Sequence, residues 1–170
     1  MEFLIREERV SDRSSVNELI KASFKNVDQV ILCEMLKNRK EFVKELSLVA
    51  EINGITTGYI LLSPVYIQTL QSSIKSLLLE PVCVLPQFQG RGIGKAIVTS
   101  ALVKARCLGF ESVFVTGSLK FYSRFGFKEA KNYGITPSVQ ILYNAFLALE
   151  LKEEKLNQQG VLIYPEEIFD

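Results

Sequence analysis

Three observations predict an α/β fold of the α+β type, in which helices pack on a mixed sheet. Two β-rich runs over 45–52 and 55–67 flank Asn53-Gly54, a dipeptide typical of a tight hairpin. A mostly apolar run over 77–85 leads through a glycine-rich turn into helically spaced apolar residues, which indicates a strand, a turn and a helix. A further apolar run over 110–116 follows that helix, so one parallel crossover accompanies the antiparallel hairpins.

One strand and two helices are expected before the hairpin. The strand covers 3–10, and Ser11 and Asp12 then offer N-caps for the first helix. The apolar residues that should face the core are Val16, Leu19, Ile20 and Phe24 in the first helix, and Val30, Ile31 and Met35 in the second, over 28–38. Pro64 predicts a bulge or an edge position in the second hairpin strand.

Three shorter elements are expected after the crossover. Gly117 and Ser118 open a helix of about two turns, a strand covers 125–131, and an alternating strand covers 145–152 before the tail. The predicted order is therefore βααβββαβαββ. The length of 170 residues, without a linker or low-complexity stretch, predicts a single domain over 1–170.

The composition limits the partners and the compartment. With 20 basic and 19 acidic residues the net charge is +1, which provides no global field for nucleic acid or an anionic membrane. The three cysteines lack metal-ligand spacing, so no metal site is expected and a reducing compartment, the cytoplasm, is favoured. Neither a signal peptide nor an apolar run of membrane-spanning length is found.

Histidine is absent, and this restricts the chemistry of any enzyme with this sequence. A nucleophile activated by histidine cannot form, and the commonest side chain for proton transfer at neutral pH is missing. Proton transfers would have to use tyrosine, cysteine, lysine, carboxylates or water.

The glycine-rich turn is the strongest candidate for a ligand site. Gly90, Gly92 and Gly94 alternate at a helix start, where unpaired N–H groups and the positive end of the helix dipole meet, and Arg91 and Lys95 add two cations. A phosphate or pyrophosphate suits such a turn. The alternative is a strand-to-helix turn that only needs the flexibility of glycine.

These residues also carry a family resemblance. Gln89-Gly90-Arg91-Gly92-Ile93-Gly94 matches the Gln/Arg-x-x-Gly-x-Gly/Ala signature of the GNAT superfamily of acetyl-CoA-dependent N-acyltransferases. The segment 121–127, Phe-Tyr-Ser-Arg-Phe-Gly-Phe, resembles a later motif of that family. The segments 47–50 and 161–165 resemble the YhbS-like bacterial branch, so the resemblance covers nearly the whole chain.

The resemblance implies a GNAT fold, in which the central strand and the strand after the long helix splay apart. It implies acetyl-CoA as cosubstrate, with the pantetheine arm held by the backbone of Val82, Cys83 and Val84. The pyrophosphate would be held by the residues of the turn: Gln89, Gly90, Arg91, Gly92, Ile93, Gly94 and Lys95.

Tyr122 and Glu80 are the candidate catalytic residues. Tyr122 matches the family's tyrosine that can protonate the departing thiolate; the alternative is an aromatic ring packed among phenylalanines. Glu80 is a carboxylate in an apolar strand where many family members place a base, although the branch favours glycine there; an ion pair with Lys75 or Arg91 is the alternative. Glu51 is a weaker candidate for the base, and the alternative is that its side chain only faces solvent.

The function expected from the resemblance is direct transfer of an acetyl group from acetyl-CoA to a primary amine in a ternary complex. Cys83 is expected to be a core residue, because alternation along its strand and its valine neighbours provide no activating partner. The alternative function is a CoA-binding sensor without turnover. The sequence does not identify the amine, and it leaves open whether the protein forms a homodimer.

Overall fold

The computed structural model describes residues 2–141 and 145–168, and it confirms the mixed α/β fold. Its strands follow the order β1-β2-β3-β4-β5-β8-β6, with β9 paired to both β3 and β7. The chain divides into two compact units: Met1–Ser63 with Glu80–Lys104 forms unit 1, and Pro64–Leu79 with Ala105–Asp170 forms unit 2. Strands β3 and β4 contribute residues to both units.

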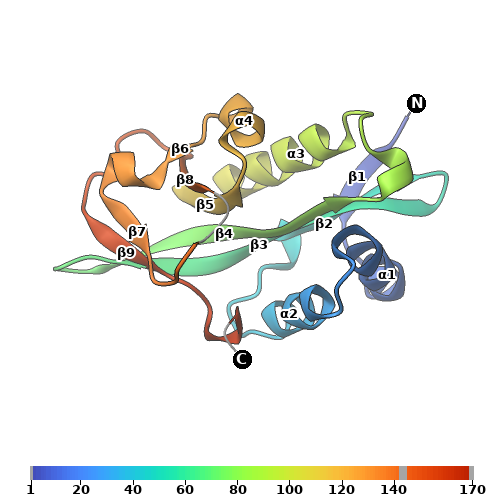
Figure 1. Cartoon of the computed structure of the whole chain (residues 1–170), viewed down its shortest axis with the longest axis horizontal. Coiled ribbons are helices and arrows are strands. Elements are labelled where there is room, and N and C mark those ends of the chain that lie inside the picture. The colour runs from blue at the N-terminus through green and yellow to red at the C-terminus, as the bar shows by residue number, and fades with distance from the viewer. Residues whose placement is uncertain (1, 142–144, 169–170) are drawn as a thin grey trace. The chain divides into compact units, whose positions relative to one another are not determined.

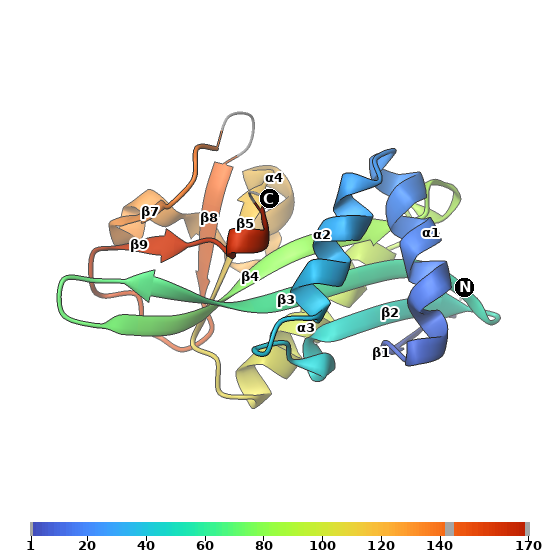
Figure 2. The same ribbon diagram turned by 90° about the horizontal axis from the view of Figure 1, so that it is seen from below.

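Unit 1 places helices on both faces of its strands. Figures 1 and 2 show α1 and α2 on one face of β2 and β3, and α3 on the opposite face. Its elements are β1 (Leu4–Glu7), α1 (Arg13–Phe24), α2 (Asp28–Lys37), β2 (Ser47–Ile52), much of β3 (Ile55–Gln68), the end of β4 (Ser73–Val84) and most of α3 (Ile93–Cys107). Because side chains alternate along a strand, both faces of this part of the sheet can be buried.

The helices of unit 1 bury a narrower set of residues than their spacing predicts. Val16, Leu19 and Ile20 are buried in α1 as expected, but Phe24 is 40% exposed at the end of the helix. In α2 the prediction for Ile31 is wrong, because its side chain is 52% exposed. The buried residues of α2 are Cys33, Leu36 and Lys37.

The hairpin is confirmed at Asn53-Gly54, since Ile52 pairs with Ile55 and both turn residues have positive φ angles. The register shift in this hairpin lies between Ala50 and Glu51, on the first strand. Pro64 falls between the part of β3 that pairs with β2, up to Leu61, and the part that pairs with β9, from Tyr66. A proline suits this position because it has no N–H to donate to a ladder.

Unit 2 contains the parallel strand pairing that the predicted crossover requires, in which Leu77 pairs with Val113 and Leu78 with Phe114. Its other elements are β5 (Ser112–Gly117), α4 (Leu119–Tyr122), β6 (Lys128–Glu129), β7 (Ile135–Pro137), β8 (Ala145–Glu150) and β9 (Gly160–Ile163). The strand predicted over 125–131 is therefore only two residues long, and the predicted tail contains β9. Segments this short carry little periodicity, so pairing partners decide their structure.

Short 3₁₀ turns complete the described chain, at Val10–Asp12, Lys44–Leu46, Pro86–Phe88, Ser123–Phe125, Ala130–Tyr133 and Glu166–Ile168. The core of unit 1 joins α1 and α2 to β2, β3 and the end of β4. The core of unit 2 includes Phe114, Ala148 and Leu162 from β5, β8 and β9.

A buried polar network ties α2 to the strands of unit 1. The Lys37 ammonium lies 2.9 Å from the Glu8 carboxylate and 3.2 Å from that of Glu34. Glu8 also accepts hydrogen bonds from the hydroxyls of Ser47 at 2.6 Å and Tyr59 at 3.3 Å. The side chains of Lys37 and Glu8 are only 3% and 8% exposed, so the pair is almost completely desolvated.

We expect Glu8→Ala to lower the free energy of unfolding by about 3–5 kcal/mol, because it leaves the Lys37 charge buried without its best partner. Urea denaturation measures the loss. The double change Glu8→Leu with Lys37→Met should recover most of it, since apolar residues can replace a buried pair at little cost. A loss below about 1 kcal/mol for Glu8→Ala would contradict this, because that is the range of exposed ion pairs.

Candidate acetyl-CoA site

The turn between β4 and α3 is fastened to the strand that precedes it. The Gln89 side-chain amide donates to the backbone carbonyl of Val84 at 3.1 Å, and the N–H of Leu85 donates to Thr57 O at 2.8 Å. Gln89 was predicted as a ligand for pyrophosphate. In the structure its side chain makes a bond within the chain, which fixes the turn against the end of β4, and its role toward pyrophosphate stays a prediction.

Two of the three glycines are required by the backbone conformation. Gly90 and Gly92 have φ angles of +75° and +84°, in the left-handed region that favours glycine. A Cβ atom built on either residue would meet nothing within 4 Å, so the space in front of both is open. A Cβ on Gly94 would make an ordinary contact of 3.8 Å with Val84. The turn therefore exposes its backbone to whatever approaches the start of α3.

The start of α3 leaves a row of backbone donors. The Ala96 N–H donates to the Gly92 carbonyl, whereas the N–H groups of residues 92–95 donate to no backbone acceptor in the described chain. The Ile93 side chain is buried and anchors the first turn. Free N–H groups at the positive end of a helix attract anions.

The charges around this turn favour an anion as well. Arg91 and Lys95 are exposed, and the first turn of α3 contains no acidic residue. The Arg91 guanidinium lies 5.4 Å from the centroid of the Phe88 ring, which supports its flat face. The residues predicted to hold pyrophosphate therefore lie together in unit 1, and the Gln89 side chain among them also fastens the turn.

The strand end before the turn is partly buried. Val82 and Val84 are half-buried, whereas Cys83 points into the core that α1 and α2 form with the strands. Burial raises the pKa of the Cys83 thiol to about 12, so almost none of it is thiolate at neutral pH. This agrees with the expectation that Cys83 is a core residue and not a nucleophile.

Glu80, the candidate base, takes no part in the ion pairs described for unit 1. It is half-buried, burial raises the pKa of its carboxyl above 4.5, and no described residue of unit 1 pairs with it. Glu51 is different, because its carboxylate accepts from Arg6 at 2.8 Å, and Arg6 also binds Asp12 at 2.7 Å. The alternative, that Glu51 only faces solvent, is therefore wrong.

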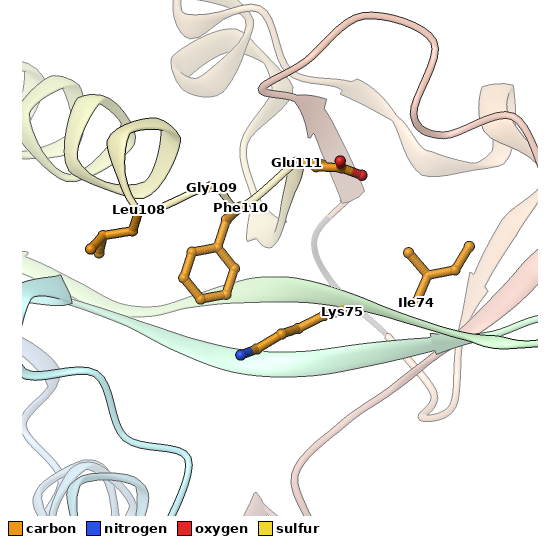
Figure 3. A pocket seen from close by; sticks show the side chains of 6 residues that line it. All are labelled: Ile74, Lys75, Leu108, Gly109, Phe110 and Glu111. Atoms are coloured by element: carbon orange, nitrogen blue, oxygen red, sulfur yellow. The ribbon is translucent and has the colours of Figure 1, made fainter.

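Lys75, which the sequence suggested as a partner of Glu80, lies in unit 2. Its ammonium is 5.2 Å from the centroid of the Phe110 ring. Both residues line a hollow of about 210 Å³ together with Glu111, and Figure 3 shows the Lys75 side chain reaching toward that ring. The Glu111 carboxylate pairs with Lys155 at 3.6 Å.

Tyr122 lies at the end of α4 in unit 2, with its ring 6% exposed. The rings of Phe121 and Phe127 pack edge-on against it, with centroids 4.9 and 5.4 Å away. Burial raises the pKa of the phenol to about 12, so it carries its proton at neutral pH. Its hydroxyl has no hydrogen-bond partner in the described part of unit 2.

Gly117 was predicted only to open the short helix together with Ser118. It is the last residue of β5, and a Cβ atom built on it would lie 2.5 Å from Cε2 of Tyr122. The only signal in the sequence is a glycine between a strand and a short helix, which equally suggests an ordinary turn.

Comparison with known proteins places this geometry in a family. The model of the acetyltransferase (GNAT) domain matches residues 44–129, half of the chain. The uncharacterized N-acetyltransferase YhbS of Escherichia coli is 27% identical over 169 residues, which cover 99% of each chain. The uncharacterized N-acetyltransferase YjhQ of the same species is 29% identical over 118 residues, 69% of this chain and 65% of that protein.

Two solved structures are similar over nearly the whole chain. A GNAT acetyltransferase from Brucella melitensis, solved with acetyl-CoA, has a TM-score of 0.79 at 29% identity and covers 99% of both chains. Escherichia coli YhbS, solved with CoA, has a TM-score of 0.90 at 24% identity and covers 100% of this chain and 93% of its own. The second likeness shows the shared fold alone.

The described residues show neither a metal-binding cluster nor a membrane-spanning helix. They contain no group of three or more Cys, Asp or Glu side chains that could hold a metal ion. No helix in the described ranges has both the length and the apolar character needed to cross a membrane.

The glycine turn, the fold and the match over residues 44–129 agree, and the chain belongs to the GNAT acetyltransferase family.

Proposed function

We propose that the protein transfers the acetyl group of acetyl-CoA directly to a primary amine in a ternary complex. The observation that carries this proposal is the row of free N–H groups at the start of α3, with two cations beside it. An acetyl-CoA complex of the Brucella melitensis relative supports the choice of cosubstrate. The three free cysteines suit a reducing compartment such as the cytoplasm.

Each part of acetyl-CoA would meet a different part of the chain. The N–H groups of Gly92, Ile93 and Gly94, with Arg91 and Lys95, would hold the pyrophosphate. The backbone of Val82, Cys83 and Val84 would hold the pantetheine arm. The placement of the pyrophosphate fits the structure, because the space in front of Gly90 and Gly92 is open. Any side chain at these two positions would fill that space. When bound, acetyl-CoA supplies an activated acyl group as a thioester.

The chain's own residues would then move two protons. Glu80 would accept the proton that an ammonium must lose before its nitrogen can attack the thioester carbonyl. After the attack the nitrogen is positively charged, and it would lose its second proton to solvent as the C–S bond breaks. Tyr122 would donate its phenolic proton to the departing sulfur and later recover one from solvent. A covalent acyl-cysteine step is disfavoured, because the Cys83 thiol has a pKa of about 12 and no histidine is present to activate it.

The test is release of free CoA thiol from acetyl-CoA with a panel of amines: a polyamine, an aminoglycoside, a peptide with a free N-terminus and a peptide with an internal lysine. Release that depends on an amine supports the proposal. Initial rates with both substrates varied should give intersecting lines, whereas parallel lines would contradict a ternary complex. Tight CoA binding without release across the panel would favour the non-catalytic sensor.

We expect the pH dependence of kcat to report Glu80. A base must be ionised to act, and burial raises the pKa of Glu80, so kcat should rise with pH through an apparent pKa above 4.5. Glu80→Gln should lower kcat and remove this limb. As a control, Glu41→Gln changes an exposed carboxylate and should keep the wild-type profile. An unchanged profile in Glu80→Gln would assign the base elsewhere.

A further inference from the structure

We propose that Gly117 is a positioning residue that sets where the Tyr122 phenol lies, and this inference rests on the proposed function. Gly117 does not need to be glycine for its backbone, because its φ is not among the positive ones. Glycine is needed there for space. A Cβ on Gly117 would lie 2.5 Å from Cε2, 3.0 Å from Cδ2 and 3.6 Å from Cζ of Tyr122. The Cζ atom carries the hydroxyl that would donate the proton.

Neither the backbone of Gly117 nor the Tyr122 ring can move freely to relieve this contact. Gly117 lies in β5, and its strand is fixed by pairing with β8, where Gly117 is opposite Ala145. The Tyr122 ring is held on its other sides by Phe121 and Phe127, with centroids 4.9 and 5.4 Å away. Phe127 is itself 2% exposed, and so has little room to move.

The size of the clash sets the expected effect. Ordinary carbon contacts lie near 3.5–4.0 Å, so a methyl group on Gly117 would push the ring by about 1 Å. A misplacement of about 1 Å in a reacting group can cost roughly 10²-fold in rate. The loss should fall on kcat, because the phenol acts on the leaving sulfur and not on the groups that bind acetyl-CoA.

The experiment is a double-mutant cycle of Gly117→Ala with Tyr122→Phe. The probe is hydroxylamine, a small nucleophile that is neutral at pH 7, with the uncatalysed reaction subtracted. We expect Gly117→Ala to lower kcat by roughly 10–10²-fold in the native background, with acetyl-CoA affinity by calorimetry unchanged. In the Tyr122→Phe background the same change should alter kcat by less than about twofold, because the proton is already lost. Equal losses in both backgrounds would overturn the inference.

A structural readout separates positioning from stability. Ring resonances of Tyr122, assigned by their absence in Tyr122→Phe, should shift in Gly117→Ala if the ring has moved. Gly54→Ala is the control for general destabilisation: its φ of +80° strains an alanine, its Cβ would meet nothing within 4 Å, and it should keep full kcat. Phe127→Leu offers a second way to move the ring should Gly117→Ala fail to fold, and it should show the same dependence on the Tyr122 hydroxyl.

The outcomes also distinguish this inference from the proposed function. If Tyr122→Phe keeps full kcat, the general-acid role is wrong, and the resonance shift alone then decides whether Gly117 positions the ring. If Tyr122→Phe loses kcat while Gly117→Ala keeps both kcat and the native Tyr122 resonances, the positioning role is wrong and the general-acid role stands.

Discussion

Replacing Tyr122 by phenylalanine should lower kcat by roughly 10²–10⁴-fold, the usual contribution of a general acid. The change deletes the phenolic proton and keeps the ring, which packs against Phe121 and Phe127. Acetyl-CoA affinity should barely change, because the phenol would act on the sulfur only as it leaves. The stability of the fold should be nearly that of the wild type, because the hydroxyl has no hydrogen-bond partner in the described part of unit 2.

The raised pKa of Tyr122 decides how this acid can work. A phenol with a pKa of about 12 holds its proton through the whole physiological range, so it should not produce a basic limb in kcat below about pH 10. It is a weak donor toward a thiolate in water, whose conjugate acid has a pKa of about 8.5. Burial also raises the pKa of a thiol, as it does for Cys83, whose pKa is about 12. The pKa of the phenol and that of the leaving thiol are therefore similar when the sulfur is also desolvated.

The measurement requires conditions under which acetyl transfer limits turnover, because slow product release would hide the defect. Single-turnover mixing with hydroxylamine meets this requirement. Tyr133→Phe is a suitable control, since it also removes a phenol from unit 2 and should keep full kcat. Full kcat in Tyr122→Phe under these conditions would remove Tyr122 from the mechanism.

Replacing Gly92 by valine should abolish CoA binding while the protein stays folded. The side chain would enter the open space in front of the N–H groups and keep the pyrophosphate away from the start of α3. Losing two charge-assisted hydrogen bonds, each worth about 1.5–3 kcal/mol, would lower affinity by roughly 10²–10⁴-fold. Calorimetric titration with CoA measures this loss.

The matched control is Gly54→Val in the hairpin turn. Gly54 has a φ of +80° against +84° for Gly92, and both positions are open around a Cβ atom. A β-branched residue is strained equally at either position, so both variants should lose similar stability. Only Gly92→Val should lose CoA. Unchanged affinity in folded Gly92→Val would move the cofactor site away from this turn.

The local elements could be predicted because their signals lie within a few neighbouring residues. Asn53-Gly54 specified the hairpin, and the spacing of apolar residues after Gly94 specified the helix that the structure places at Ile93–Cys107. The turn could also be predicted from its glycines, since the positive φ angles of Gly90 and Gly92 exclude most other residues. These features depend on backbone conformation and periodicity, which the sequence determines by itself.

Other features depended on contacts between residues far apart in the chain. The spacing predicted that Ile31 would be buried, but the packing of α2 against the strands turned Cys33 and Leu36 inward. Arg6 reaches Glu51 across 45 residues, and no local pattern indicates that this carboxylate is already paired. Strand β9 forms because β3 and β7 provide its partners.

The candidate site shows the same division. The sequence by itself determined the glycine-rich turn at the start of α3, because glycine conformation and helix polarity are local properties. Only the tertiary structure decided that Gln89 fastens this turn to Val84 and that Glu80 has no partner within unit 1. It also decided that Gly117 leaves room for the Tyr122 ring. The physical reason is that burial, ion pairing and close packing are set by neighbours in space, which folding brings together from distant parts of the chain.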